Sequence, residues 1–269
     1  MSVVLHLSDT HFGTEQPPVL DALLRLVQAE APDLLLLSGD ITQRARRRQF
    51  QAAQVFVQGL AVSGTLVVPG NHDIPLFNLV ARLFFPYANY QRVFGHDLEP
   101  TYTSTDLLVL GVNTTRPWRH KDGEVSAAQI ARVSARLRQA SATQLRIVMI
   151  HQPVAVTRPV DEANLLHGHQ QAVYAWAEAG ADLIVGGHIH LPYVRPLSEF
   201  FPDLPQRLWA VQAGTAVSSR VRDGIPNSVN LLRYSGAAPC RCVVERWDHE
   251  APRQRFKLVQ QTVLQLQRR

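Results

Sequence analysis

Five short clusters of residues that can bind metal or phosphate follow one another along this 269-residue chain. In order they are Asp9-Thr10-His11, Gly39-Asp40, Gly70-Asn71-His72-Asp73, His151 and Gly187-His188-Ile189-His190. Asp, Asn and His together suit a pair of divalent metal ions, because a carboxylate can bridge both ions while imidazoles or amides complete each shell. A single Asp-x-His or His-x-His pair would carry little weight, but five clusters together predict a dinuclear metal centre.

The elements that must position these clusters are short apolar runs, which predict β-strands. The runs cover residues 3–7, 34–38, 66–68, 147–150 and 183–185. Side chains at the carboxyl ends of neighbouring strands converge on one crevice, so we expect the clusters to meet there. Helical periodicity over residues 18–30, about 46–60, 126–140 and 170–178 alternates with the strands and predicts an α/β layered architecture.

The C-terminal part of the chain changes character and is mostly β. Strands are predicted at residues 208–212, 229–232, 242–247 and 256–264. Earlier in the chain, two short strands are predicted near residues 102–103 and 107–112. Residues 192–205 and 222–227 are expected to be surface loops. No linker separates two domains, so we predict one domain over residues 1–269, with the motifs within residues 9–190 and residues 208–265 completing a second sheet.

The bulk composition is that of an ordinary globular protein, with 46% hydrophobic and 18% charged residues. The net charge is +5, and nearly all the positive charge is arginine. A moderately basic surface favours anionic partners such as phosphates, nucleic acid or acidic lipid head groups, but a compositional bias of the source genome is the favoured explanation. The two cysteines, Cys240 and Cys242, are expected to be free thiols in a reducing compartment. The first strand begins too early for a signal peptide, and no apolar stretch is long enough to span a membrane, so a cytoplasmic location is expected.

The order of the clusters resembles that of the calcineurin-like metallophosphoesterases, over about the first 190 residues. The resemblance implies a four-layer α-β-β-α sandwich, in which two mixed β-sheets face each other and the metal site lies at the carboxyl ends of the strands. It implies two divalent or trivalent transition metal ions, and manganese, iron and zinc all suit such shells. The implied ligands are Asp9, His11 and His190 for the first ion, Asn71, His151 and His188 for the second, and Asp40 for both.

The resemblance also implies a metal-dependent phosphoesterase, in which a hydroxide shared by the two metals attacks phosphorus. Asp40 is catalytic in this scheme because it bridges the metals. His72 directly follows a ligand, and the resemblance implies that it contacts the phosphate or the leaving oxygen as a charge stabiliser or general acid. The chain departs from a common family pattern at Gln43, where many members carry an Asp that polarises this His. The role of His72 as proton donor is therefore left open.

The stretch from Leu5 to Gly13 and the Gly-Asn-His-Asp loop resemble the bacterial branch that contains cyclic-nucleotide phosphodiesterases. The expected substrate is therefore a phosphodiester, with a 3′,5′-cyclic nucleotide favoured, or a phosphomonoester. The alternatives are a lipid-linked pyrophosphate of the UDP-diacylglucosamine type, a nucleic acid, and a metal-free interaction scaffold. Nucleic acid is disfavoured as a substrate, because nucleases of the double-strand-break repair type usually carry an extra capping domain and helical extensions. This chain is too short to include them.

Two further segments are candidates for contact with the substrate or a partner. Asn113, Arg116 and His120 follow a predicted strand and are expected near the rim of the crevice, where an arginine could hold a phosphate oxygen. Residues 77–94 contain six aromatic residues and two arginines. This segment could be a lid over an apolar substrate group, a homodimer contact, or helices packed on the core sheet, of which the last is favoured. In the lipid-linked alternative it would touch the membrane peripherally.

Overall fold

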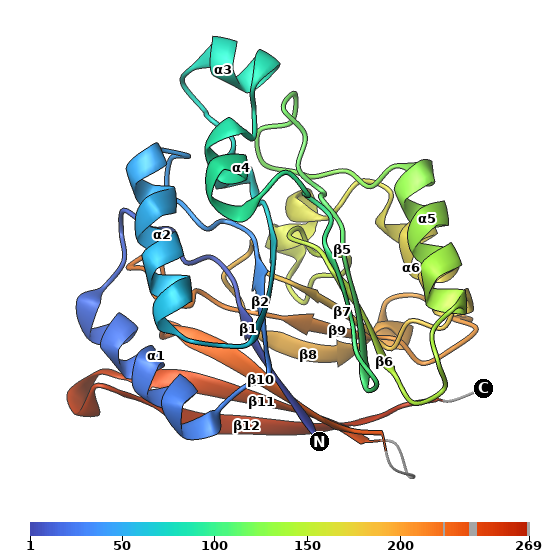
Figure 1. Cartoon of the computed structure of the whole chain (residues 1–269). Coiled ribbons are helices and arrows are strands. Elements are labelled where there is room, and N and C mark those ends of the chain that lie inside the picture. Colours follow the sequence, from blue (N-terminus) through green and yellow to red (C-terminus); the bar gives the residue numbers. More distant parts are fainter. Residues whose placement is uncertain (223, 237–240, 268–269) are drawn as a thin grey trace.

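The computed structural model describes residues 1–222, 224–236 and 241–267, so Cys240 lies outside the described residues. Two mixed sheets of six strands face each other, and helices cover the outer face of each sheet (Figure 1). The strand orders are β12-β11-β10-β1-β2-β3 and β4-β5-β6-β7-β9-β8. The predicted four-layer α-β-β-α sandwich is therefore confirmed.

The first sheet joins strands from both ends of the chain. Its central strand β1 pairs in parallel with β2, β2 pairs in parallel with β3, and β10 to β12 extend the other side as antiparallel strands. The strands are β1 (Ser2–Leu7), β2 (Leu34–Ser38), β3 (Gly64–Val68), β10 (Ser228–Ser235), β11 (Arg241–Glu250) and β12 (Arg255–Gln265). Cys242 lies buried in β11, where a strand was predicted.

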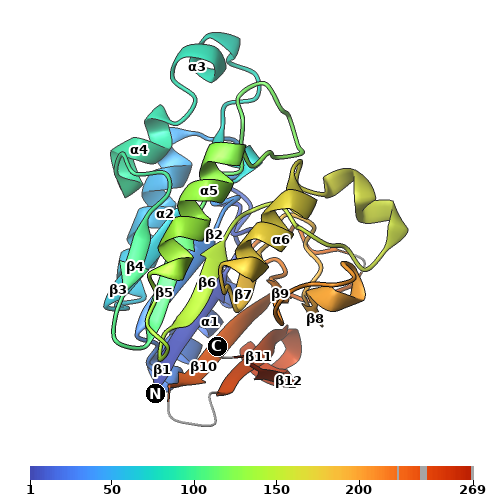
Figure 2. The same ribbon diagram turned by 90° about the vertical axis from the view of Figure 1, so that its right-hand side faces the viewer.

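The second sheet has a parallel centre, since β5, β6, β7 and β9 run in the same direction, with an antiparallel strand at each edge. Its strands are β4 (Thr101–Thr103), β5 (Leu107–Gly111), β6 (Leu145–Met149), β7 (Leu183–Gly186), β8 (Tyr193–Pro196) and β9 (Trp209–Gln212). Figure 2 shows this sheet with helices α5 and α6 in front of it.

The helices bury apolar faces against the sheets, as their periodicity predicts. Helices α1 (Pro17–Glu30) and α2 (Arg47–Gly59) cover the first sheet, and α5 (Ala127–Arg138) and α6 (His169–Glu178) cover the second. Ser126 caps the N-terminus of α5, because its side chain accepts a hydrogen bond from the main-chain amide of Gln129. Two short helices, α3 (Leu79–Phe84) and α4 (Ala88–Phe94), lie between β3 and β4. None of the helices in the described ranges is long and apolar enough to cross a bilayer.

Both faces of the central strands are buried, which explains why the strands read as continuous apolar runs rather than alternating patterns. Leu5 and Leu7 of β1 belong to the core beneath α1 and α2, whereas Val4 belongs to the core between the two sheets. A third core lies between the second sheet and α5 and α6. The side-chain alternation of each strand thus fills two cores at once.

Two predictions about the C-terminal part were wrong. Residues 192–205 were expected to be a loop, but they contain the edge strand β8 and a 3-10 turn at Leu197–Glu199. A proline within a strand is typical of a sheet edge, and such a short pattern with a proline at its end resembles a loop. Residues 208–265 were expected to complete the second sheet. Only β9 joins that sheet, whereas β10 to β12 extend the first.

Candidate metal centre

The five clusters lie in loops that follow parallel strands, and the two sheets bring these loops together. Asp9 and His11 follow β1, Asp40 follows β2, and a 3-10 turn at Asn71–Asp73 follows β3. His151 follows β6, and the last two histidines follow β7. The carboxyl ends of three strands in one sheet and two in the other therefore face a common site, as the strand-end argument predicts.

The backbone at this site is held in an unusual conformation. Asp9, His11, Asp40, His188 and His190 all have positive φ, between 41° and 75°. They are half of the ten non-glycine residues with positive φ in the described part of the chain. Each such residue costs about 1–3 kcal/mol, and strain of this kind concentrates where function requires a particular side-chain placement.

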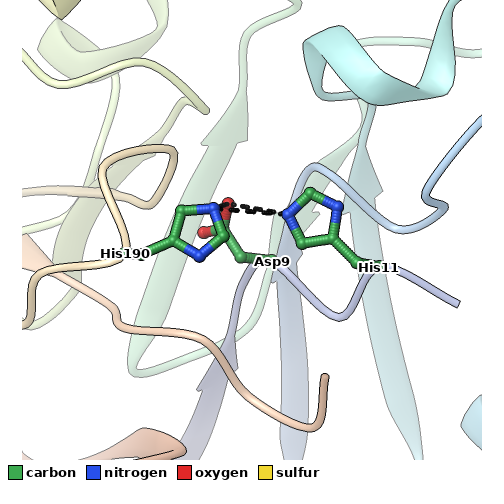
Figure 3. A group of neighbouring side chains, drawn as sticks. All are labelled: Asp9, His11 and His190. Carbon is green, nitrogen blue, oxygen red and sulfur yellow. Dashed lines mark hydrogen bonds and ion pairs between the residues drawn. The ribbon is translucent and has the colours of Figure 1, made fainter. Parts of the chain in front are cut away.

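The first group of potential ligands is Asp9, His11 and His190, drawn in Figure 3. The Nε2 atoms of His190 and His11 lie 3.4 Å and 3.7 Å from Oδ1 of Asp9, and 3.3 Å from each other. Oδ1 of Asp9 is buried and has no hydrogen-bond partner among the described residues. Two imidazole nitrogens facing an unpartnered carboxylate oxygen form a donor set that suits a divalent cation.

The second group is Asp40, His151 and His188, with Asn71 beside it. Oδ1 of Asp40 lies 3.2 Å from Nε2 of His151, and Oδ1 of Asn71 lies 3.3 Å from that nitrogen and 3.0 Å from Nδ1 of His188. The other oxygen of Asp40, Oδ2, lies 3.7 Å from Nε2 of His11 in the first group. Asp40 therefore faces both groups, one oxygen toward each.

Hydrogen bonds behind the ligand groups fix the orientation of two imidazoles. Nδ1 of His151 lies 2.8 Å from the Ser38 carbonyl, and Nδ1 of His190 lies 2.7 Å from the Arg220 carbonyl. A carbonyl can only accept, so Nδ1 carries a proton in both rings and Nε2 is the nitrogen that faces the site.

Burial and charge set the protonation of the site without metal. Burial lowers the pKa of His11 and of His188 well below the usual value, so both rings are neutral and able to bind a metal. Burial also acts to lower the pKa of His151, but the Asp40 carboxylate outweighs it and raises that pKa to about 9. Burial acts to raise the pKa of Asp40, but His151 and His72 outweigh it and hold that pKa well below its usual range. Metal binding must therefore displace a proton from His151.

Gly70 is required for the close approach of two ligand loops. A Cβ atom on this residue would collide with the backbone nitrogen and Oδ1 of Asp40. Asp73 ties the same loops together, because its carboxylate accepts hydrogen bonds from the amides of Ile41, Thr42 and Gly70. Asp73 therefore orients the loop that carries Asn71 and His72.

His72 lies in the site, and its surroundings explain what Gln43 does there. Nδ1 of His72 lies 3.0 Å from the main-chain carbonyl of Gln43, so Nδ1 carries the proton. Nε2 lies 3.2 Å from Nη1 of Arg220, and the same Nη1 donates to the Gln43 side-chain oxygen at 3.1 Å. The main chain of residue 43 therefore orients His72, while its side chain holds an arginine.

A cavity of about 490 Å³ opens over the ligand groups. Its cationic lining residues are Arg44, Lys121, Arg220 and Arg222, and His120 also lines it. His120 therefore lies at the cavity, and its contact with the substrate stays a prediction. Asn113 and Arg116 lie elsewhere: Arg116 donates to the main chain of Asn113 and Thr115 and to Gln129. The polar groups of both residues stabilise the loop rather than line the cavity.

Sequence reasoning missed Arg220, which is the arginine nearest to His72. Arg220 lies in the loop that follows β9, and β9 runs parallel to β7 beside it. Strand β9 was predicted, so the strand-end rule applied to its following loop would have pointed to this segment.

Two facing sheets with paired carboxylate and imidazole groups at their strand ends define a dimetal phosphoesterase. The chain belongs to the calcineurin-like phosphoesterase family, whose sequence model matches residues 2–192. It is therefore a metal-dependent phosphoester hydrolase with a dinuclear site built from His and Asp residues.

Individual proteins resemble the chain in sequence or in fold. A probable cyclic nucleotide phosphodiesterase from Synechococcus sp. is 25% identical over 188 residues, 68% of each chain. A dimetal phosphatase from Danio rerio superposes with a TM-score of 0.68 at 13% identity, over 99% of both chains. A purple acid phosphatase from yellow lupin superposes with a TM-score of 0.74 at 12% identity, over 98% of this chain and 53% of the other. At these identities, the two structures show the shared fold alone.

Proposed function

We propose that this protein hydrolyses a phosphodiester, with a 3′,5′-cyclic nucleotide as the favoured substrate. The observation that carries the proposal is the position of Asp40, which presents one oxygen to each of two adjacent ligand groups. The similarity to a probable cyclic nucleotide phosphodiesterase supports the substrate class.

In this proposal Asp9, His11 and His190 hold one metal, and Asn71, His151 and His188 hold the other, with Asp40 bound to both. Manganese, iron or zinc fits this mixture of oxygen and nitrogen donors. When bound, the metal pair supplies an activated water and neutralises charge on the phosphoryl group. The filled ligand positions argue against a metal-free scaffold.

The remaining chemistry falls to Arg220 and His72. Arg220 carries a permanent positive charge at the cavity wall and donates its hydrogen bonds to phosphoryl oxygens. His72 keeps one proton on Nδ1 through the Gln43 carbonyl, so Nε2 is the atom that can exchange a proton with the leaving group. The cavity volume of about 490 Å³ fits a nucleotide-sized ligand.

Metal content and activity of matched variants test the proposal. Wild type should bind two metals per chain, Asp40→Asn should lose both, and Asp9→Asn should keep the second site occupied. Hydrolysis should be compared on a cyclic nucleotide, bis(p-nitrophenyl) phosphate, a phosphomonoester and a lipid-linked pyrophosphate, with manganese, iron or zinc added in turn. Equal activity of wild type and Asp40→Asn would refute the proposed centre, and a kcat/KM highest for the monoester or the pyrophosphate would refute the substrate class.

A further inference from the structure

Helix α3 and its flanks expose apolar side chains to solvent, whereas a typical surface helix turns them toward the core. Six side chains, here called the α3 surface, are 67–80% exposed: Phe77, Leu79, Val80, Leu83, Phe84 and Phe85. Figures 1 and 2 show α3 projecting from the body of the protein. The prediction that residues 77–94 pack on the core holds for Tyr90, which is buried, but is wrong for α3.

The inward side of α3 is formed by a charged residue instead of an apolar one. Arg82 is 9% exposed and donates hydrogen bonds to the carbonyls of Pro75, Pro117 and Arg119 at 3.1, 2.6 and 2.7 Å. These bonds fix α3 to the loop that carries Trp118, which is 71% exposed. The apolar side chains therefore face outward from a helix that hydrogen bonds hold in place.

Arginines border one side of the α3 surface, where Arg44 and Arg46 line a hollow together with Phe77. Between Asp40 and Asp97 the sequence contains six arginines, no lysine and one acidic residue, the buried Asp73. Five of those arginines are exposed, and the guanidinium of Arg44 lies 5.4 Å from the centre of the Phe77 ring. Large exposed apolar patches mark interaction sites, and a cationic border selects an anionic partner.

The α3 surface is continuous with the mouth of the metal centre. Arg44 and Leu76 line a hollow that also contains Asn71 and His72, and they line a second hollow together with Phe77. A partner bound to the α3 surface would therefore lie at the entrance of the cavity.

We propose that the α3 surface docks onto an anionic lipid bilayer and holds the mouth of the metal centre toward it. Aliphatic and aromatic side chains enter the boundary between head groups and acyl chains, while arginines bind the anionic head groups. A symmetric contact with a second copy fits less well, because it would bring the arginines of both copies together. The proposal does not depend on which phosphoester is hydrolysed.

Vesicle sedimentation with the full chain tests the proposal. Vesicles should contain phosphatidylglycerol and phosphatidylcholine in a roughly one-to-two ratio, with pure phosphatidylcholine for comparison. Wild type should bind the anionic vesicles and lose binding as salt rises. Leu83→Glu/Phe84→Glu should weaken binding about tenfold or more, because two apolar side chains no longer enter the bilayer.

The matched control is Val259→Glu/Val263→Glu on β12, which replaces two exposed apolar residues with the same charges far from α3. Both variants should keep the thermal stability and the bis(p-nitrophenyl) phosphate hydrolysis of wild type. Equal binding of the two variants to anionic vesicles would overturn the proposal. A wild-type dimer that the α3 variant alone converts to a monomer, without vesicle binding, would assign the surface to a second copy and also overturn it.

Discussion

Arg220 provides the sharpest test of how the site handles negative charge. Its Nη1 atom lies 3.2 Å from Nε2 of His72 and is held by the Gln43 side chain at 3.1 Å. A charge about 4 Å from a phosphoryl oxygen contributes roughly 4 kcal/mol at an effective dielectric constant near 20. Loss of one preorganised donor of this kind lowers kcat by about 10²–10³. Arg220→Met, which keeps most of the side-chain length, should therefore lower kcat by that factor.

The assay is hydrolysis of bis(p-nitrophenyl) phosphate by metal-loaded protein, with metal content measured on the same samples. Metal content should not change, because His190 contacts the main-chain carbonyl of Arg220, which the substitution keeps. The kcat of Arg220→Lys should lie between those of wild type and Arg220→Met, since lysine keeps the charge but lacks the planar guanidinium. The control Arg48→Met removes the same charge from an exposed position on α2. A kcat for Arg220→Met within about threefold of that for Arg48→Met, at equal metal content, would refute the reasoning.

Two further predictions concern stability. His6 is fully buried, its Nε2 lies 2.9 Å from the Ser38 hydroxyl, and burial lowers its pKa from 6.5 to about 3. Below pH 6.5 the His6 ring takes up a proton in the unfolded chain but not in the folded one. His6 should therefore lower the free energy of unfolding by about 1.4 kcal/mol for each pH unit as the pH falls toward 3. The free energy of unfolding in urea should depend less on pH for His6→Gln than for wild type between about pH 4 and 6.5. Equal slopes for the two proteins would contradict the assignment of this pH dependence to His6. In thermal unfolding, Gly70→Ala should destabilise the protein by about 1–3 kcal/mol, because the added Cβ collides with Asp40. The matched variant Gly59→Ala, whose Cβ meets open space at the end of α2, should stabilise the protein by up to ~1 kcal/mol.

The parts of the molecule that could be predicted from the sequence are those encoded locally. Strands β1, β2 and β7 are buried on both faces, so each reads as a largely apolar run, interrupted in β1 only by His6, and a ligand residue follows two positions after each strand ends. The strand-end rule then places Asp9, Asp40 and His188 together without knowledge of the strand order. The alternation of strands and helices predicts the layers for the same reason.

The parts that failed depend on pairing between distant segments. The local pattern predicts a strand at residues 229–232, within the observed β10, but it does not indicate that β10 pairs with β1 instead of with β9. The exposure of α3 was not predicted, because its apolar residues are typical of a helix packed on the core. The three hydrogen bonds of Arg82 show which side of α3 faces inward. The strand-end rule points to the loop after β9 that contains Arg220, but only the fold shows which arginine of that loop reaches His72.

The site also explains how His72 stays oriented without a carboxylate at position 43. A main-chain carbonyl accepts the Nδ1 proton whatever side chain is present, so the orientation of the ring does not require an acid. The neutral amide of Gln43 holds Arg220 by one hydrogen bond and, being uncharged, does not offset its positive charge. A carboxylate there would form an ion pair with Arg220 and reduce the charge available to a phosphoryl group. Gln43 and Arg220 therefore act together, and the permanent charge lies on the arginine, beside the ring that can exchange a proton.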